Sequence, residues 1–410
     1  MRFYMALFLA APLAAQHDMA NMPGMQHDAT PSATTTIMEA SGTSANPASS
    51  PMTMTGFTAG HWTLMFHGVA FITGIQQTGP RGADKFISTS WFMGEASHKL
   101  AGGTFSLRSM LSLDPATVTD RRYPELFQTG ETAYGKPIVD AQHPHDFVME
   151  LALHYSHPLS DKSSWEIYAA PVGDPALGPV AFPHRVSAEE LPQATLGHHL
   201  QDSTHISSEV VTGAVTRGIF RLEASGFHGA EPGENRWNID HGAIDSYSAR
   251  LTLSPNPNWT GQFSAGRLAH PEQLERGDQI RTTASVTWNR PYTNGHWATS
   301  LIWGRVHKTA GGANLNGYGL ESVAQFAHRN YVTGRIELVD KDELLATGQQ
   351  FRVSAYTAGY TRDFYPVPHI AAGIGANITG YAMPAALHAN YGDHPVSVLF
   401  FIRFKLRPAA

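Results

Sequence analysis

Apolar and polar residues alternate along most of this chain, and the alternation limits the folds available to it. In residues 247–254, YSARLTLS, every second side chain is apolar or aromatic and those between are largely polar. A period of two is typical of a β-strand with one apolar face. The pattern recurs at residues 147–155, 220–225 and 332–338, where the opposite face carries charged residues. The sequence therefore predicts an all-β fold.

Applied to the whole chain, the pattern predicts about sixteen strands. They fall at residues 61–75, 86–98, 103–113, 146–157, 163–172, 206–216, 218–228, 244–254, 258–268, 280–290, 296–308, 318–328, 330–340, 350–364, 368–382 and 395–406. Long connections such as 114–145 and 173–205 alternate with tight ones such as 101–102. This is typical of a transmembrane antiparallel β-barrel of the bacterial outer membrane, whose short turns face the periplasm. We expect a barrel over residues 61–406 with both termini in the periplasm.

The tryptophans agree with this topology. Five of the eight fall near the predicted periplasmic strand ends: Trp62, Trp165, Trp259, Trp288 and Trp297. Aromatic side chains of membrane proteins gather at the membrane interface. The final strand also resembles the aromatic C-terminal strand by which the barrel assembly machinery recognises its substrates, although Lys405 to Ala410 follow the usual terminal aromatic residue.

Composition narrows the alternatives. Charged residues make up 15% of the chain, against roughly 25% in soluble proteins. The net charge is −6 and no long basic block occurs, so nucleic acid is not an expected partner. Beyond residues 1–15, the sequence has no run of 18 apolar residues, which an inner-membrane helix would require. A β-barrel can cross a membrane without such a run, because its apolar residues alternate with polar ones. A soluble two-sheet periplasmic β protein stays open as an alternative, because it gives the same alternation.

The N-terminal part has a different composition. Residues 1–15 read as a secretory signal peptide, with Arg2 before an apolar stretch that ends in small residues near Ala15. Residues 16–60 are rich in Ala, Ser, Thr, Pro and Met and lack periodicity, which predicts a disordered periplasmic tail. The chain has no cysteine, which excludes disulfides and thiolate metal sites.

Charged residues on the polar strand faces are expected to line the lumen, which in a barrel of this size can hold an aqueous channel. They include Glu150, Arg221, Glu223, Arg250, Arg335, Glu337 and Arg403. His67 and His154 occupy similar positions. We expect these two histidines to face the lumen and not to ligate metal.

The predicted tail contains a candidate soft-metal site. Its residues are His17, Met19, Met22, Met25 and His27, with Met38, Met52 and Met54 further along. Thioether sulfur suits Cu(I), and imidazole accepts either oxidation state of copper. The alternative is that these residues are incidental to a linker.

The predicted long loops hold a second set of metal candidates: His143, His145, Asp146, His198, His199, Asp202 and His205. The topology places these groups, and also Asp240–His241 and Asp393–His394, at one end of the barrel. Four His/Asp groups are therefore expected to converge on the extracellular mouth. Such groups bind Cu(II) or Zn(II), but they also form ordinary turn-capping hydrogen bonds.

Enzyme motifs are weak. Neither a Gly-x-Ser-x-Gly elbow nor a His-Glu-x-x-His helix occurs, so we assign no catalytic residue. No cofactor is certain, and a copper ion is the candidate. The alternative is an outer-membrane hydrolase with an Asp/His site at the rim, built from the loop residues His143, His145, Asp146, Asp202 and His205.

Three stretches are similar to those shared by a group of poorly characterised bacterial outer-membrane barrel proteins. They are YPELFQTGETAYGKPIVDAQHPHDFVMEL, LGHHLQDSTHI and YGDHPVSVLFF, and the resemblance covers most of residues 61–404. It implies an exported barrel and no established activity. Residues 16–55 are similar in composition to the tail of outer-membrane copper-resistance proteins of the B type, which implies contact with copper.

These observations predict a porin-like outer-membrane barrel that passes or sequesters small polar solutes or metal ions, with a role in copper homeostasis. Its expected partners are outer-membrane lipid, the barrel assembly machinery and the solute or ion.

Overall fold

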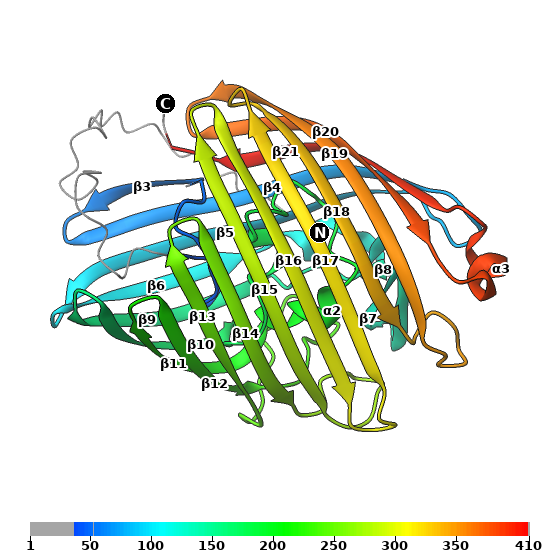
Figure 1. The fold of residues 1–410 in the computed structure, drawn as a ribbon, viewed down its shortest axis with the longest axis horizontal. Coiled ribbons are helices and arrows are strands. Elements are labelled where there is room, and N and C mark those ends of the chain that lie inside the picture. The colour runs from blue at the N-terminus through cyan, green and yellow to red at the C-terminus, as the bar shows by residue number, and fades with distance from the viewer. Residues whose placement is uncertain (1–36, 52, 409–410) are drawn as a thin grey trace, which may run out of the picture.

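A computed structural model describes residues 37–51 and 53–408, and its main body is a closed antiparallel barrel of sixteen strands (Figure 1). Each strand pairs with the next around the wall, and β21 pairs with β4 to close it. The strands are β4 (Trp62–Gln77), β5 (Lys85–Leu100), β6 (Gly103–Leu111), β9 (Val148–Ser160), β10 (Ser163–Gly173), β11 (Ser207–Arg217), β12 (Phe220–His228), β13 (Ser246–Asn256), β14 (Trp259–Leu268), β15 (Gln279–Tyr292), β16 (Gly295–Lys308), β17 (Asn314–Phe326), β18 (Asn330–Lys341), β19 (Phe351–Val367), β20 (Ile370–Ala382) and β21 (Val396–Leu406). All sixteen predicted strands are present, with ends shifted by at most four residues, at the start of β17.

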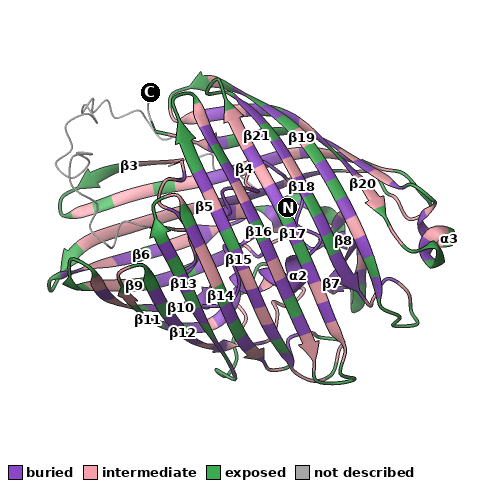
Figure 2. Ribbon diagram, in the orientation of Figure 1, coloured by how far each residue is buried: buried purple, intermediate pink, exposed green. Residues whose placement is uncertain are grey.

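Burial alternates along the strands, and the apolar face points outward (Figure 2). In β13, Leu251 and Leu253 are exposed, whereas Arg250 and Thr252 are buried. The seven charged residues predicted to line the lumen are all buried: Glu150, Arg221, Glu223, Arg250, Arg335, Glu337 and Arg403. Many of them form ion pairs with a residue of another strand on the lumenal face of the wall. For example, Arg250 Nε lies 2.8 Å from a carboxylate oxygen of Glu223. The closed wall with its apolar exterior excludes the two-sheet alternative.

The two ends of the barrel differ. Tight turns such as residues 101–102 and 218–219 lie at one end, and the long connections lie at the other. Trp259 and Trp288 are paired directly at the tight-turn end, and the rings of Trp288 and Trp297 lie 5.5 Å apart. This confirms the predicted one-sided placement of these tryptophans.

Two long connections fold into the barrel. The first contains α1 (Asp114–Thr117), η3 (Thr119–Arg121) and the hairpin β7 (Tyr123–Ala133) and β8 (Lys136–Gln142). The second, residues 174–206, contains η4 (Phe182–His184), α2 (His198–Gln201) and η5 (Ser203–His205), and is buried along most of its length. Figure 1 shows α2 inside the wall. Two ion pairs hold the second connection to the wall: Arg185 pairs with Glu321 of β17, and Glu190 pairs with Lys405 of β21.

Residues 37–51 also lie inside the barrel. β1 (Ile37–Glu39) and β2 (Ala45–Pro47) form a small hairpin, and arginines of the wall hold the segment that joins them. Arg108 donates to the carbonyl of Gly42 at 2.9 Å, and Arg250 donates to Thr43 Oγ1 at 2.9 Å. The structure thus differs from the expected disordered tail over its last part, because the polar residues find partners inside the barrel. The predicted signal peptide lies outside the described residues.

β3 (Met54–Ala59) completes the wall beside β21. It pairs with residues 62–67 of β4, and β21 pairs with residues 69–77 of the same strand edge. β4 has sixteen residues and β21 has eleven, so β21 alone does not pair with the whole edge of β4.

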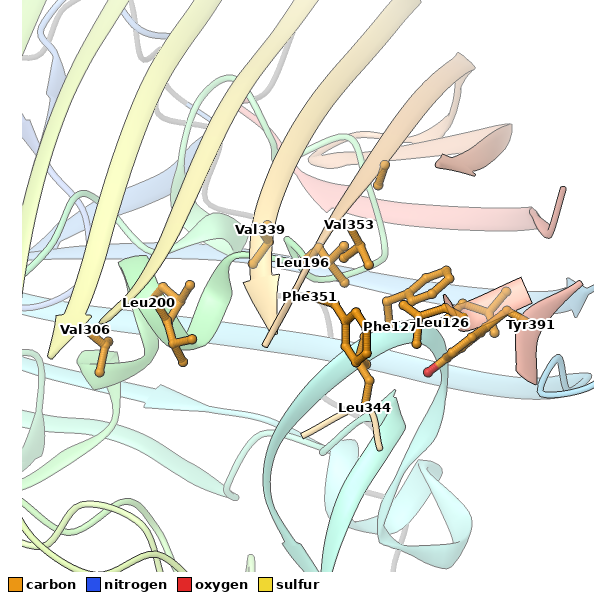
Figure 3. Close-up of a cluster of buried hydrophobic side chains, with 13 residues drawn as sticks. Leu126, Phe127, Leu196, Leu200, Val306, Val339, Leu344, Phe351, Val353 and Tyr391 are labelled. Carbon is orange, nitrogen blue, oxygen red and sulfur yellow. The ribbon is translucent and has the colours of Figure 1, made fainter. Parts of the chain in front are cut away.

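An apolar cluster closes part of the long-loop end (Figure 3). It joins the β7–β8 hairpin, residues 174–206, the ends of β16 to β19, and the segment of η6 (Ala385–Leu387) and α3 (His388–Tyr391). The rings of Phe127 and Tyr391 stack at 4.1 Å in this cluster. Among the described residues, no helix is long and apolar enough to cross a membrane.

Candidate metal centre

The two inward connections meet at a group of histidines in the lumen. His143 follows β8 in the first connection, and His198 and His199 begin α2 in the second. These three residues are buried, and each offers a ring nitrogen within 4.8 Å of the others. Three imidazoles at this separation match the histidine ligand sets that bind Zn(II) and Cu(II).

Two more histidines extend the group. The ring of His205 lies 5.3 Å from that of His198, and the ring of His145 lies 5.6 Å from that of His205. Phe182 covers one side, with its ring centroid 5.3 Å from His198. The structure thus brings together all five loop histidines among the predicted metal candidates.

Four of the five rings are oriented by a hydrogen bond at Nδ1. The partners are Asp202 Oδ1 for His198 at 2.6 Å, the Asp202 carbonyl for His205 at 2.9 Å, Asp114 Oδ2 for His145 at 3.0 Å and the Pro144 carbonyl for His143 at 3.1 Å. Carbonyl oxygens, and carboxylates when ionised, only accept hydrogen bonds, so each Nδ1 donates. This leaves the lone pair on Nε2, as in metal-ligating histidines whose other ring nitrogen donates to an oxygen.

Several of the remaining ring nitrogens have no hydrogen-bond partner. Nε2 of His143, Nε2 of His205 and both nitrogens of His199 are buried and unsatisfied among the described residues. Nε2 of His143 lies 3.0 Å from Glu131 Oε1, but not in hydrogen-bonding geometry. Buried polar atoms are nearly always satisfied in proteins. A metal ion would supply the missing partner for these nitrogens.

Burial favours the neutral form of three of these imidazoles, those of His143, His199 and His205. It lowers the pKa of His143 well below 6.5, with the neighbouring His199 and His198 acting in the same direction. It lowers the pKa of His199 to about 4, against the opposing effect of Glu231, and the pKa of His205 to about 3. Neutral imidazole is the form that ligates metal.

Asp202 links the histidines to the barrel wall. Its Oδ1 accepts from His198, and its Oδ2 accepts from Arg185 at 2.9 Å, which in turn pairs with Glu321. Burial acts to raise the pKa of Asp202, but the hydrogen bond from His198 and the charge of Arg185 hold it below its ordinary value. The ionised carboxylate fixes the tautomer of His198.

Three acidic residues near the site were not expected from the sequence: Asp114, Glu131 and Glu231. Asp114 orients His145, and Glu131 lies between His143 and Arg236. Glu231 Oε1 is 3.7 Å from His199 Nδ1. Asp114 and Glu131 come from the first long connection and Glu231 from the one between β12 and β13, so only the folded loops reveal their proximity to the histidines.

The expected convergence of four groups on the extracellular mouth is wrong. Two groups meet, and they meet inside the lumen because their connections fold inward. Asp146 does not join them, since it pairs with Arg236 at 3.2 Å. His241 is exposed and contacts Glu209, and Asp393 contacts His388. The tail candidates His17, Met19, Met22, Met25 and His27 lie outside the described residues, as does Met52.

A second group, Glu39, His154 and Glu166, also has ligand atoms within 4.8 Å of one another. Arg221 pairs with Glu166, and Arg108 lies 3.3 Å from Glu39. The guanidinium groups therefore balance these carboxylates without a metal. His154 faces the lumen as the sequence predicts, on the wall of a polar cavity of about 350 Å³ at the tight-turn end.

No family model and no curated protein matches this chain. Solved structures do. The anion-selective porin from Comamonas acidovorans is 11% identical, with 84% of this chain and 100% of that chain covered and a TM-score of 0.52. OmpF of Salmonella typhi in complex with daunomycin is 9% identical, with 86% of this chain and 100% of that chain covered and a TM-score of 0.53. Loop-deleted OmpT of Vibrio cholerae is 8% identical, with 84% of this chain and 99% of that chain covered and a TM-score of 0.50. The chain therefore shares the barrel fold of these porins and outer-membrane proteins.

Proposed function

We propose that this protein is a porin-like barrel of the bacterial outer membrane that holds a copper or zinc ion at the histidines inside its lumen. One observation carries the metal site. Four imidazoles donate from Nδ1 to oxygen acceptors, while the buried Nε2 atoms of His143 and His205 remain without partners. That is the arrangement of a metal-ligating histidine cluster.

The exterior supports the location in a membrane. Apolar side chains cover the outside of the strands, and tryptophans gather at the tight-turn end. Both are features of outer-membrane barrels. In this proposal the tight turns and residue 406 face the periplasm, the long loops face outward, and the barrel assembly machinery inserts the chain.

Copper is the ion we favour. Imidazoles bind Cu(II) more tightly than Zn(II) according to the usual order of affinities. The predicted tail adds thioether and imidazole ligands at Met19, Met22, Met25, His17 and His27, which suit Cu(I). The tail would then capture soft metal in the periplasm while the lumen binds Cu(II).

The lumen supports gated and not free passage. The inward connections, residues 37–51 and the apolar cluster of Figure 3 occupy much of it. Small polar solutes or ions would pass only when a loop moves. Metal bound between the two connections would hold them together and keep the path closed.

A metal titration of the full-length protein in detergent tests this proposal. Zn(II), which has no redox chemistry, is titrated against a competing chelator, and the number of tight sites per chain is measured. We expect H198Q to lose one site. H296Q is the matched control, because His296 is also buried in the lumen but hydrogen bonds to Asn289, outside the cluster.

Equal loss of binding in H198Q and H296Q, or no tight site apart from those of the tail, would contradict the proposal. Conductance in a planar bilayer gives a second readout, in which added metal should reduce channel openings. Turnover of a lipid, ester or peptide that disappears in H145Q or H205Q would instead support the hydrolase alternative.

A further inference from the structure

A row of methionine and histidine crosses the barrel wall at the seam. Met54 of β3 is directly opposite His67 of β4, and His67 is directly opposite Met93 of β5. Side chains of directly opposed residues point to the same face of a sheet. Met65 lies two residues from His67, on the same face. All four line a cavity of about 270 Å³ inside the wall.

The second inward connection adds another histidine to this cavity. His184, at the end of η4, lines it from the lumen side. Its ring lies 4.2 Å from that of Trp91, which lies 4.6 Å from that of His67. His184 is 7% exposed, and neither of its ring nitrogens has a hydrogen-bond partner among the described residues. An unsatisfied imidazole at this depth indicates a missing partner in the cavity.

We propose that this cavity is a second metal site, specific for a soft monovalent cation such as Cu(I). Thioether sulfur prefers Cu(I), and imidazole completes its ligand set. Met54, Met65 and Met93 would supply sulfur, and His184 would supply nitrogen. His67 Nε2 lies 2.6 Å from Thr53 Oγ1, so Nδ1 is the nitrogen through which His67 would bind the ion.

The charges on the cavity wall favour a cation. Glu39, Glu95 and Glu189 line it together with Arg108. Arg108 pairs with Glu39 and Glu95 at 3.3 and 3.0 Å, and Glu189 lies 3.4 Å from Lys405. Among the described residues that line the cavity, three are carboxylates and only Arg108 is an arginine or lysine, so negative side chains outnumber positive ones.

The second site goes beyond the proposed function and shares no ligand with the histidine cluster. The two are nevertheless neighbours on one connection. Phe182, two residues before His184, contacts the ring of His198 at 5.3 Å and that of His145 at 6.2 Å. Residues 174–206 therefore carry a ligand for a soft ion at one point and ligands for a harder ion at another.

The experiment is an anaerobic titration of the full-length protein with Cu(I) against a chromophoric chelator. All variants are made in a background that lacks the tail ligands (H17S, M19S, M22S, M25S and H27S) and in which H198Q disables the lumenal histidine cluster. In that background we expect one tight Cu(I) site per chain. M93L and H184F should weaken it by at least about tenfold, because each removes one donor atom while leaving a side chain of similar size.

M149L is the matched control, because Met149 is buried beside this cavity but does not line it. It should bind Cu(I) as the background protein does. X-ray absorption should show sulfur ligands that decrease in M93L. In a chain that keeps His198, M93L should leave the Zn(II) site of His143, His198 and His199 unchanged, which separates the two proposals.

Absence of a tight Cu(I) site in the background protein overturns the inference, as does equal weakening in M93L and M149L. Binding of an apolar dye that M93L abolishes, without Cu(I) binding, would also overturn it and identify the cavity as an apolar pocket.

Discussion

The backbone of Gly130 lies against the imidazole ring of His199, so closely that a Cβ atom at residue 130 would come within 2.5 Å of the ring. Gly130 also has a φ of +122°, a conformation that residues with a side chain rarely adopt. The β7–β8 hairpin therefore sets the position of a candidate metal ligand by the absence of a side chain.

Replacing Gly130 by alanine should displace His199 and weaken metal binding. We expect G130A to lower the Zn(II) affinity of the lumenal site by about 10- to 100-fold, as is typical when a residue that orients a ligand is changed. Affinity is measured by the same chelator competition. G135A is the control, since Gly135 is in the same hairpin with φ of +69° but has no atom within 4 Å of its added Cβ. Equal weakening in both variants would attribute the effect to backbone strain.

The pH dependence of stability should report the buried His205. Its pKa is lowered by burial from 6.5 to about 3. Between these values the unfolded chain binds a proton that the folded chain does not, so folding loses stability as the pH falls below 6.5, on the order of 1 kcal/mol per pH unit. In H205Q this contribution is absent. Thermal unfolding is measured in detergent from pH 7.5 to 4.5. As the pH falls, the unfolding temperature of wild type should therefore decrease more than that of H205Q. A difference independent of pH would show that His205 titrates normally.

The apolar cluster at the long-loop end should act as a seal. Phe127 is fully buried in it and stacks on Tyr391 at 4.1 Å. We expect F127A to cost about 3–5 kcal/mol of stability, because it leaves a cavity, and to raise single-channel conductance. L387A removes less volume from the same cluster and should have a smaller effect on both. An unchanged conductance in F127A would place the barrier elsewhere, at residues 174–206.

The outward apolar face should tolerate charge poorly. Leu251 points out of β13, and Thr252 points into the lumen beside the 350 Å³ cavity. L251R should destabilise the barrel in a bilayer by about 2–4 kcal/mol, as an arginine near the membrane midplane does. T252R should be tolerated, because an arginine there reaches Glu223. Similar stability of the two variants in lipid would argue against a membrane location.

The wall of the barrel was predictable because one physical rule governs it. Each strand must place apolar residues outward and polar residues inward, so burial keeps a period of two over residues 246–255 of β13 and 331–339 of β18. The charged residues Glu223 and Arg250 follow from the same rule, since a side chain on the polar face of a closed sheet has only the lumen to enter.

The contents of the lumen do not follow from any period. In the β7–β8 hairpin, Phe127, Glu131 and Asp140 adopt positive φ, which breaks the alternation by which a strand is recognised. Residues 40–51 have the composition of a flexible tail, and only partners such as Arg108 and Arg250 give them a place.

The candidate site was predictable in kind but not in position. Histidines 143, 145, 198, 199 and 205 stand out by their density in two connections. Whether a long connection projects outward or folds inward depends on contacts such as that of Arg185 with Glu321, which are far apart in the sequence. The same limit concealed the row of Met54, His67 and Met93, because strand register and not sequence spacing brings them together.

The seam at β4 couples the inside of the barrel to its wall. Residues 40–51 are anchored among the lumenal arginines, and β3 follows within three positions to cover the part of β4 that β21 does not reach. A force that withdraws this segment from the lumen is therefore transmitted along the chain to the hydrogen bonds between β3 and β4. Removal of residues 40–51 from the lumen and separation of β3 from β4 are therefore mechanically coupled, because one continuous stretch of backbone joins them.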